Sequence, residues 1–240
     1  MTDLPAPIRR EERRQLGPLR RAAARRLKDV QNETATLTTF NDIDVTAIRG
    51  LKDRHAQAFE RRAGHALGLT GFFVTACAQA LGEFPDLNAV VAGDEVVHRS
   101  YMDIAVGIDT TAGEITPIIR DADRLDHRAI EALLADYAKR AHDGTLSLAD
   151  LAGGTFTIRD MGGAGGLISN QLLSPGQSAI LCLHRAEERP MAIDGAIVIR
   201  TMMYASLSYD HRLIDGAGAV SFLKTVKQRI EDPTRLIIGV

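Results

Sequence analysis

The strongest constraint on the fold is a pair of long strands near the C-terminus. Residues 189–210, RPMAIDGAIVIRTMMYASLSYD, form two strand-like runs separated by Asp194-Gly195, a dipeptide that favours the tight turn of a β-hairpin. The apolar run QSAILCLHRA, residues 177–186, predicts a buried strand directly before the hairpin. Strands this apolar need a sheet to lie in and helices to cover it.

The remaining sequence supplies both kinds of element. Strands are predicted over 34–45, in a hairpin over 88–99 that turns at Gly93-Asp94, over 101–109 and 115–120, and over 155–158 after a short helix ending at Gly153-Gly154. Helical periodicity predicts helices over 18–31, 46–63, 69–83, 127–142 and 216–231. Strict βαβ alternation is missing, so we expect one mixed sheet with helices packed on it, an α/β fold.

Composition limits the class of partner. The chain has 240 residues, 45% of them hydrophobic, and a net charge of −2, so no whole-chain field attracts nucleic acid or an anionic membrane. The segment up to Lys28 carries nine Lys and Arg against three Asp and Glu, but without interleaved aromatic residues it favours a solvated helix face or a docking linker over a nucleic-acid site. We expect residues 1–16 to be a linker end or flexible arm and residues 17–240 to be the folded domain.

The two cysteines, Cys77 and Cys182, lie in apolar surroundings and suggest neither a disulfide framework nor a metal cluster, so no metal is expected. No apolar run is long enough to span a bilayer, and the N-terminal Arg pairs lack an apolar signal core. The sequence predicts a soluble intracellular protein without membrane partners. We expect a cytoplasmic protein in a bacterium, or a mitochondrial matrix protein in a eukaryote.

A polar turn between a strand and a helix is the candidate site. In SLSYDHRLIDGAGAVSFL, residues 206–223, His211 follows the strand, and Asp215 lies four residues later where the helix begins. Histidine is the side chain most often used as a general base near neutral pH. A histidine hydrogen-bonded at a strand end would give the same pattern, so spacing alone leaves both interpretations open.

The longer string LSYDHRLIDG resembles the signature of the dihydrolipoamide acyltransferases, the core components of 2-oxo acid dehydrogenase complexes. Chloramphenicol acetyltransferase is a more distant relative with a similar motif. Further segments resemble the family in family order and extend the likeness from about residue 18 to residue 240: TTFNDIDV, FPDLNAVV, ITPIIRDAD, GGTFTI, QSAIL and IEDPTRL. The resemblance implies a chloramphenicol-acetyltransferase-like two-layer α/β sandwich with a mixed sheet. In this family such subunits form trimers with the active site between subunits.

The resemblance also implies roles for individual residues. His211 matches the histidine that takes the proton from the thiol of coenzyme A or dihydrolipoamide, so that the thiolate attacks a thioester carbonyl. Asp215 matches an aspartate that braces the site through an arginine, for which Arg20 is the candidate. The channel for the substrates is expected to include Asp160, Ser169, Asn170 and His184. A solvated residue at a strand end is the alternative for His184.

The segments TATLTTFND and YDHRLIDG are most similar to the succinyltransferase branch, which serves 2-oxoglutarate dehydrogenase. This likeness implies coenzyme A as a substrate and a lipoyl group carried on another domain or chain. The implied partners are a lipoyl domain and the decarboxylase and dihydrolipoamide dehydrogenase components. A homotrimer that assembles into a larger hollow core is also implied, with the apolar C-terminal RLIIGV at inter-trimer contacts.

Arg159 departs from the family pattern. It stands in GGTFTIRDMGG where the family has Ser or Thr, whose hydroxyl donates to the oxyanion. Loss of one such donor typically costs about 2.7–4 kcal/mol. Asp160 replaces a frequent asparagine, Cys182 replaces a usual glycine, and the channel segments read MGGAGGLIS and NQLLSPGQ. The glycine-rich stretch is not a nucleotide-binding loop, since it lacks the spacing of either common motif.

Three functions remain open on the sequence. The first is a working acyltransferase, with Arg159 as a catalytic substitute for the missing hydroxyl. The second is a scaffold with the same fold whose chemistry has been weakened through Arg159. The third is a stand-alone acyltransferase that uses a small free acceptor.

Overall fold

The computed structural model of the chain describes residues 10–110 and 113–239. Its main body is a sheet of six strands in the order β1-β10-β9-β8-β4-β7. Strand β8 is parallel to both of its neighbours, β4 and β9, whereas the other pairs are antiparallel. The sheet strands are β1 (Thr36–Asp44), β4 (Ile104–Val106), β7 (Ile118–Ile119), β8 (Phe156–Asp160), β9 (Ala179–Ile193) and β10 (Ala196–Asp210). The expected α/β class with a mixed sheet is confirmed.

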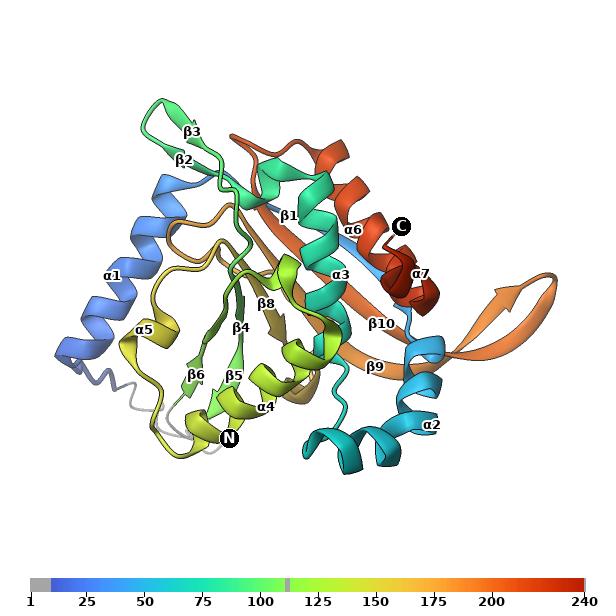
Figure 1. Cartoon of the computed structure of the whole chain (residues 1–240). Coiled ribbons are helices and arrows are strands. Elements are labelled where there is room, and N and C mark those ends of the chain that lie inside the picture. Colours follow the sequence, from blue (N-terminus) through green and yellow to red (C-terminus); the bar gives the residue numbers. More distant parts are fainter. Residues whose placement is uncertain (1–9, 111–112, 240) are drawn as a thin grey trace, which may run out of the picture.

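Three long helices form a layer on one face of this sheet. Figure 1 shows α3 and α6 lying across the strands, with α4 beside them. The helices are α1 (Pro18–Glu33), α2 (Thr46–Ala63), α3 (Thr70–Glu83), α4 (His127–His142), α5 (Leu148–Leu151), α6 (Gly216–Glu231) and α7 (Pro233–Ile238). Short 3₁₀ turns are η1 (Pro85–Asn88), η2 (Ala122–Arg124) and η3 (Gly162–Ala164). The five long predicted helices are confirmed, whereas α7 was not predicted.

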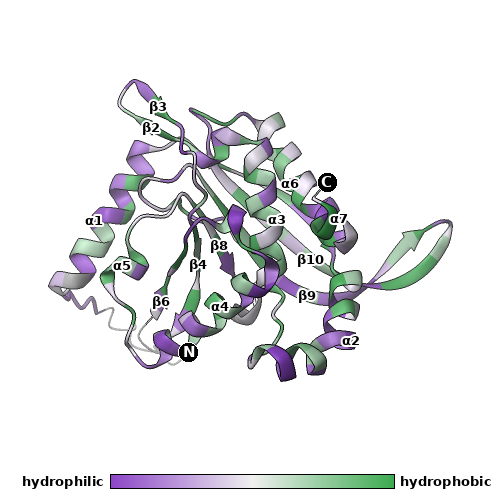
Figure 2. Ribbon diagram, viewed as in Figure 1, coloured by the Kyte–Doolittle hydropathy of each residue, from purple (hydrophilic) through white to green (hydrophobic). Residues whose placement is uncertain are grey.

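Strand alternation gives the two faces of the sheet different chemistry. Ile158, Leu181 and Leu207 belong to the main core under the helices. Their chain neighbours Thr157, Cys182 and Ser206 are buried on the other face, since successive side chains of a strand point to opposite faces. Figure 2 shows apolar residues concentrated along the sheet and in α3. The polar face of the sheet is the one that carries Arg159, Ser206 and Ser208.

The predicted hairpin is the longest feature of the sheet. β9 and β10 each run for 15 residues, and their far ends project beyond the body of the molecule (Figure 1). The separate strands predicted over 177–186 and from residue 189 are therefore a single strand, because the intervening residues continue the same ladder with β10. Both cysteines are buried and free, and burial raises the pKa of the Cys182 thiol to about 12.

Residues 101–120 differ from the predicted pair of strands. They divide into β4 and β7 in the main sheet and a separate two-stranded ladder of β5 (Ile108–Thr110) and β6 (Gly113–Ile115). The division falls at Gly107, whose N–H donates to Ile158 O of β8 at 2.9 Å, and before Pro117, which has no N–H to donate. The hairpin predicted at Gly93-Asp94 is confirmed as β2 (Val90–Ala92) and β3 (Glu95–Val97).

The predicted N-terminal arm lies partly outside the described residues. Residues 10–17 are exposed and form no helix or strand. In α1, Val30 is buried against the polar face of the sheet with Leu173 and Cys182, whereas Leu27, three residues earlier, is 55% exposed. The boundary between arm and domain stays a prediction. In the part of the chain that the structure describes, no helix is long and apolar enough to cross a membrane.

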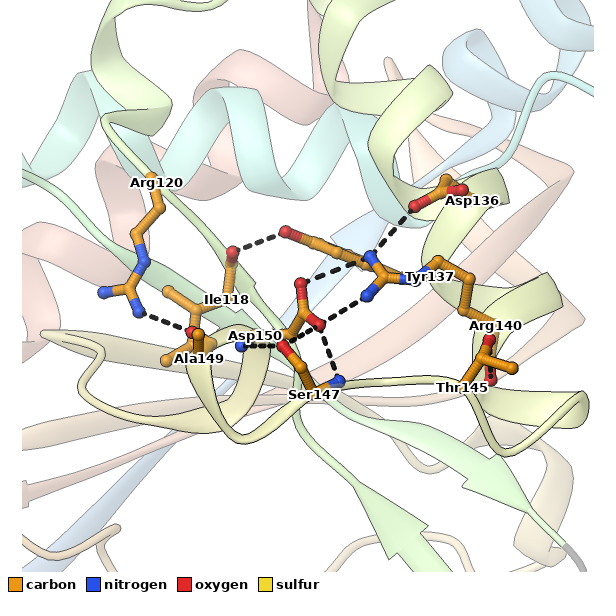
Figure 3. A network of polar contacts seen from close by, with 9 residues as sticks. All are labelled: Ile118, Arg120, Asp136, Tyr137, Arg140, Thr145, Ser147, Ala149 and Asp150. Atoms are coloured by element: carbon orange, nitrogen blue, oxygen red, sulfur yellow. Dashed lines mark hydrogen bonds and ion pairs between the residues drawn. The ribbon is translucent and has the colours of Figure 1, made fainter.

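A network of polar contacts fixes the approach to β8 (Figure 3). Arg140 of α4 forks the carboxylate of Asp150 in α5, with Nη1 and Nη2 donating at 3.2 and 2.5 Å. Asp150 also accepts from the Ser147 hydroxyl at 2.6 Å, which holds the pKa of Asp150 at about 2. Arg120 donates to the carbonyls of Ala149 and Ala152 at 3.2 and 2.5 Å. The network sets the course of the chain into β8, the strand that ends with Arg159 and Asp160.

Candidate active site

The turn that carries His211 is tied to the start of β1. Asp210, the last residue of β10, is 2% exposed, and its carboxylate accepts from Arg212 Nη2 at 2.6 Å and from Ala35 N at 3.2 Å. The His211 N–H donates to Ala35 O at 2.9 Å. The neighbouring charged residues therefore hold the backbone of the turn, and the side chain of His211 is left exposed.

Asp215 lies at the start of α6, as predicted. Its side chain accepts from Gly218 N at 2.6 Å and caps the helix. Arg20 is exposed on α1, and within the described residues no hydrogen bond or ion pair joins it to Asp215. The predicted pairing of Arg20 with Asp215 stays a prediction, and the contact that the chain itself provides for Asp215 is the helix cap.

A surface groove of about 790 Å³ runs past His211. It brings together three segments that are distant in sequence: the end of α1 with the start of β1, the stretch before β9, and the turn after β10. The lining residues are Gln31, Thr34, Ala35, Thr36, Leu37, Thr38, Asn170, Gln171, Leu172 and His211. Asn170, predicted to belong to the channel, therefore faces the same groove as His211.

His184 is linked through Ser206 to the segment before β9, which lines the groove. It is 2% exposed inside β9, so the alternative of a solvated residue at a strand end is wrong. Its Nε2 lies 3.0 Å from Ser206 Oγ, and that hydroxyl donates to Ser169 O at 2.9 Å. Because Ser206 has one hydrogen to give, His184 Nε2 is the donor in the first contact. Burial lowers the pKa of His184.

Arg159 at the end of β8 makes contacts that the sequence did not predict. Its Nε donates to Glu114 Oε1 at 2.5 Å, its Nη2 pairs with Glu114 Oε2, and its Nη1 donates to Gln171 Oε1 at 2.6 Å. Asp160 does not pair with it; its carboxylate accepts from Gly162 N at 2.9 Å. Gln171 lies in the departing segment NQLLSPGQ, but nothing in the sequence around Glu114 marked that residue.

The arrangement offers two chemical groups. His211 is an exposed imidazole at a groove, where it can accept a proton from an approaching thiol. Arg159 is a fixed cationic donor that can stabilise developing negative charge on oxygen. The two residues make no direct contact in the chain. Gln171 accepts from Arg159 and lines the same groove as His211. Among the described residues no His, Cys, Asp or Glu side chains form a group of three able to hold a metal.

Comparison with solved structures identifies the class of fold. Azotobacter vinelandii dihydrolipoamide acetyltransferase matches with a TM-score of 0.87 and 29% identity, over 98% of this chain and 99% of that one. The truncated catalytic core of the 2-oxoacid dehydrogenase multienzyme complex from Thermoplasma acidophilum matches with a TM-score of 0.81 and 32% identity, over 93% and 99% of the two chains. The fold is thus that of dihydrolipoamide acyltransferase cores.

Sequence comparison agrees. The family model for 2-oxoacid dehydrogenases acyltransferase (catalytic domain) matches residues 8–238, so the chain belongs to this family. The dihydrolipoyllysine-residue succinyltransferase component of the 2-oxoglutarate dehydrogenase complex from Rickettsia bellii is 47% identical over 231 residues, 96% of this chain and 58% of the relative. The same component from Escherichia coli (strain K12) is 44% identical over 232 residues, 97% and 57% of the two. The chain therefore spans a little over half the length of these relatives.

The Azotobacter enzyme was studied for the catalytic roles of a serine, a histidine and an asparagine. These three are spaced along its sequence as Arg159, His211 and Asp215 are spaced here.

Proposed function

We propose that this chain is the catalytic domain of a dihydrolipoamide succinyltransferase, which moves a succinyl group between dihydrolipoamide and coenzyme A. The observation that carries the proposal is the 44–47% identity to succinyltransferase components along nearly the whole chain. The exposed imidazole of His211 at a groove supports it, because acyl transfer to a thiol needs a base beside an open site.

In the proposed reaction, His211 accepts the proton of the dihydrolipoamide thiol. The sulfur attacks the thioester carbonyl of succinyl-coenzyme A, a C–S bond forms, and the carbonyl π electrons move onto oxygen. Arg159 donates to this oxyanion. The oxyanion then collapses, the bond to the coenzyme A sulfur breaks, and that sulfur takes the proton from His211. Every step is reversible, so either thiol can be the acceptor.

The proposal includes an assembly. In the described chain Arg159 and His211 do not touch, which fits a site completed where two copies of the subunit meet. We propose a homotrimer that assembles into a hollow core, served by a lipoyl domain and by the decarboxylase and dihydrolipoamide dehydrogenase components of a 2-oxoglutarate dehydrogenase complex. One of the matching solved structures is the cubic core of the pyruvate dehydrogenase complex, at 28% identity and a TM-score of 0.87. The proposed location is the bacterial cytoplasm.

One observation favours a second candidate function. Arg159 already forms an ion pair with Glu114, so part of its hydrogen-bonding capacity and its positive charge are not free for an oxyanion. If its remaining N–H groups do not reach the reacting carbonyl, the chain is a scaffold core with little activity. The rate of succinyl transfer from succinyl-coenzyme A to free dihydrolipoamide separates the two, since ordinary enzymes turn over about 1–1,000 times per second.

His211→Ala is the test of the base. We expect the turnover number to fall by about 10²–10⁴-fold, the usual contribution of general acid–base catalysis. The Asp210 carboxylate and the backbone of the turn keep their contacts, so particle mass and thermal unfolding should stay those of the wild type. A variant that retains full turnover would remove His211 from the reaction. A variant that fails to fold would show that the residue is structural, and His211→Gln would then be assayed in its place.

A further inference from the structure

The guanidinium of Arg159 is held from two sides. The side-on fork to Glu114 uses Nε and Nη2, and the contact with Gln171 uses Nη1. A bidentate arginine–carboxylate pair fixes the plane as well as the position of the guanidinium. The side chains of Arg159 and Glu114 are 26% and 21% exposed, so the pair is largely shielded from water and is screened less than a surface pair.

Gly107 makes room for this pair. A Cβ built on Gly107 would lie 2.3 Å from Glu114 Oε1 and 3.3 Å from Arg159 Cγ. Any larger residue there would displace the carboxylate, since a Cβ atom essentially never lies within 3.0 Å of another such heavy atom. Gly107 sits where the chain leaves β4 of the main sheet and enters β5, opposite the end of β8. The space that the ion pair occupies thus exists because residue 107 has no side chain.

Gln171 fixes the other side of the guanidinium. Its backbone N–H donates to Ser208 Oγ at 3.3 Å, and its side-chain Nε2 donates to Ser169 Oγ at 3.1 Å. With Nε2 engaged in this way, Oε1 is directed at Arg159. The same residue lines the groove beside His211, so the orientation of Arg159 is coupled to the wall of the groove.

Arginine has five N–H hydrogens, and the three contacts use one on each nitrogen. One hydrogen therefore remains on Nη1 and one on Nη2. We propose that Glu114 and Gln171 are positioning residues that aim these two hydrogens at the oxyanion. The inference rests on the proposed function, because it assigns Arg159 the task that a hydroxyl performs in relatives.

The contacts of Glu114 and Gln171 with Arg159 should affect the kinetics. Glu114 balances the positive charge, so Arg159 acts as a directed donor and not as a free cation that would capture the distal carboxylate of a succinyl group. Loss of these contacts should therefore lower the turnover number without raising KM, because the donor is needed in the transition state and not for binding. A displacement of about 1 Å at a reacting centre can cost about 100-fold in rate.

The test is a double-mutant cycle of Glu114→Gln and Arg159→Ala, assayed for succinyl transfer to dihydrolipoamide. We expect Arg159→Ala to lower the turnover number by about 100–1,000-fold and Glu114→Gln by about 10–100-fold. In the Arg159→Ala background, Glu114→Gln should have no further effect, because Glu114 acts through Arg159. The matched control is Asp109→Asn, which removes an exposed carboxylate paired across the same ladder from Glu114 and should behave as wild type.

Two further variants keep the inference open to refutation. Gly107→Ala displaces the pair without removing a charge, and Gln171→Ala removes the acceptor for Nη1, so both variants should reproduce the Glu114→Gln effect. Crystal structures should show the guanidinium ordered against Glu114 in the wild type and displaced in Gly107→Ala. Wild-type rates in both Glu114→Gln and Gly107→Ala would overturn the positioning role while leaving the proposed function intact. An inactive wild type would instead overturn the proposed function, and the positioning role with it.

Discussion

Asp210 determines the geometry of the candidate active site without contacting a reacting atom. It is nearly fully buried between Arg212, which it binds through two nitrogens, and the backbone N–H of Ala35. Burial alone would raise the pKa of this carboxyl, but the hydrogen bonds from Arg212 and from the backbone outweigh it and lower the pKa. The ionised carboxylate therefore stabilises the folded turn on which His211 sits.

We expect Asp210→Asn to lower the free energy of unfolding by about 1–3 kcal/mol at pH 7, the usual cost of losing hydrogen bonds to a charged group. A lowered pKa means that the stabilisation is present above the ordinary value of 3.8 and is lost as the pH falls through the folded-state pKa. Urea unfolding of both proteins at pH 7, 4 and 3 should show the difference shrinking at the lowest pH. Asp53→Asn, on the exposed surface of α2, is the control. A difference that is constant with pH would contradict the assignment.

At the scale of elements, α3 and α4 meet through a buried carboxylate. Glu131 of α4 is 3% exposed, and its Oε2 accepts from Gly68 N, just before α3, at 2.9 Å. Burial raises the pKa of Glu131. Gly71 in the first turn of α3 faces the same carboxylate, and a Cβ added there would lie 2.1 Å from Oε1. The absence of a side chain at Gly71 therefore allows the two helices to approach.

Gly71→Ala should destabilise the protein by about 1–3 kcal/mol, because overpacking a tight contact outweighs the better helix propensity of alanine. Gly82→Ala, in the last turn of the same helix, is the matched control. A Cβ there meets only Met102 Cε at 3.7 Å, so this variant should gain about 0.4–1 kcal/mol. Urea unfolding midpoints of both variants give the comparison. Shifts in the same direction would show that the contact with Glu131 does not limit the packing of α3.

At the scale of the whole molecule, the C-terminal helix α7 exposes apolar side chains. Ile237 and Ile238 are 79% and 68% exposed. Leu236 and Ile237 border an apolar pocket of about 500 Å³ that Phe59, Leu67 and Phe72 also line. The sequence resemblance placed RLIIGV at inter-trimer contacts; Val240 lies outside the described residues. An apolar end beside an apolar pocket is suited to binding the same region of another copy.

Ile237→Asp should therefore dissociate the proposed larger assembly into smaller particles, because a charge would be buried at each contact without a partner. Light scattering of the purified protein, whose chain mass is 26.0 kDa, measures the change. Leu148→Asp, at an 86% exposed position on α5, controls for the added charge. Particles of unchanged mass would remove α7 from the assembly contacts.

The local pattern of the sequence was sufficient for most elements. Helical periodicity located α4 and α6 because each buries one face, and Asp194-Gly195 located the turn of the long hairpin because few other residues accept its backbone conformation. The pattern failed over residues 101–120. There the division into four short strands depends on the contact of Gly107 with β8, which lies about 50 residues further along the chain.

The candidate site divides in the same way. The sequence by itself determined that His211 and Asp215 flank a turn at the start of a helix, because strand alternation and helix capping depend on residues close together in the chain. That Arg159 stands where the family has a hydroxyl is what the motif resemblance implied. Only the tertiary structure decided that Glu114 and Gln171 hold Arg159. It also decided that His184 contacts Ser206, whose hydroxyl donates to Ser169 O. Those contacts depend on which strands are neighbours in the sheet and which face each side chain occupies. Strand order arises from the packing of the whole sheet, and no local pattern encodes it.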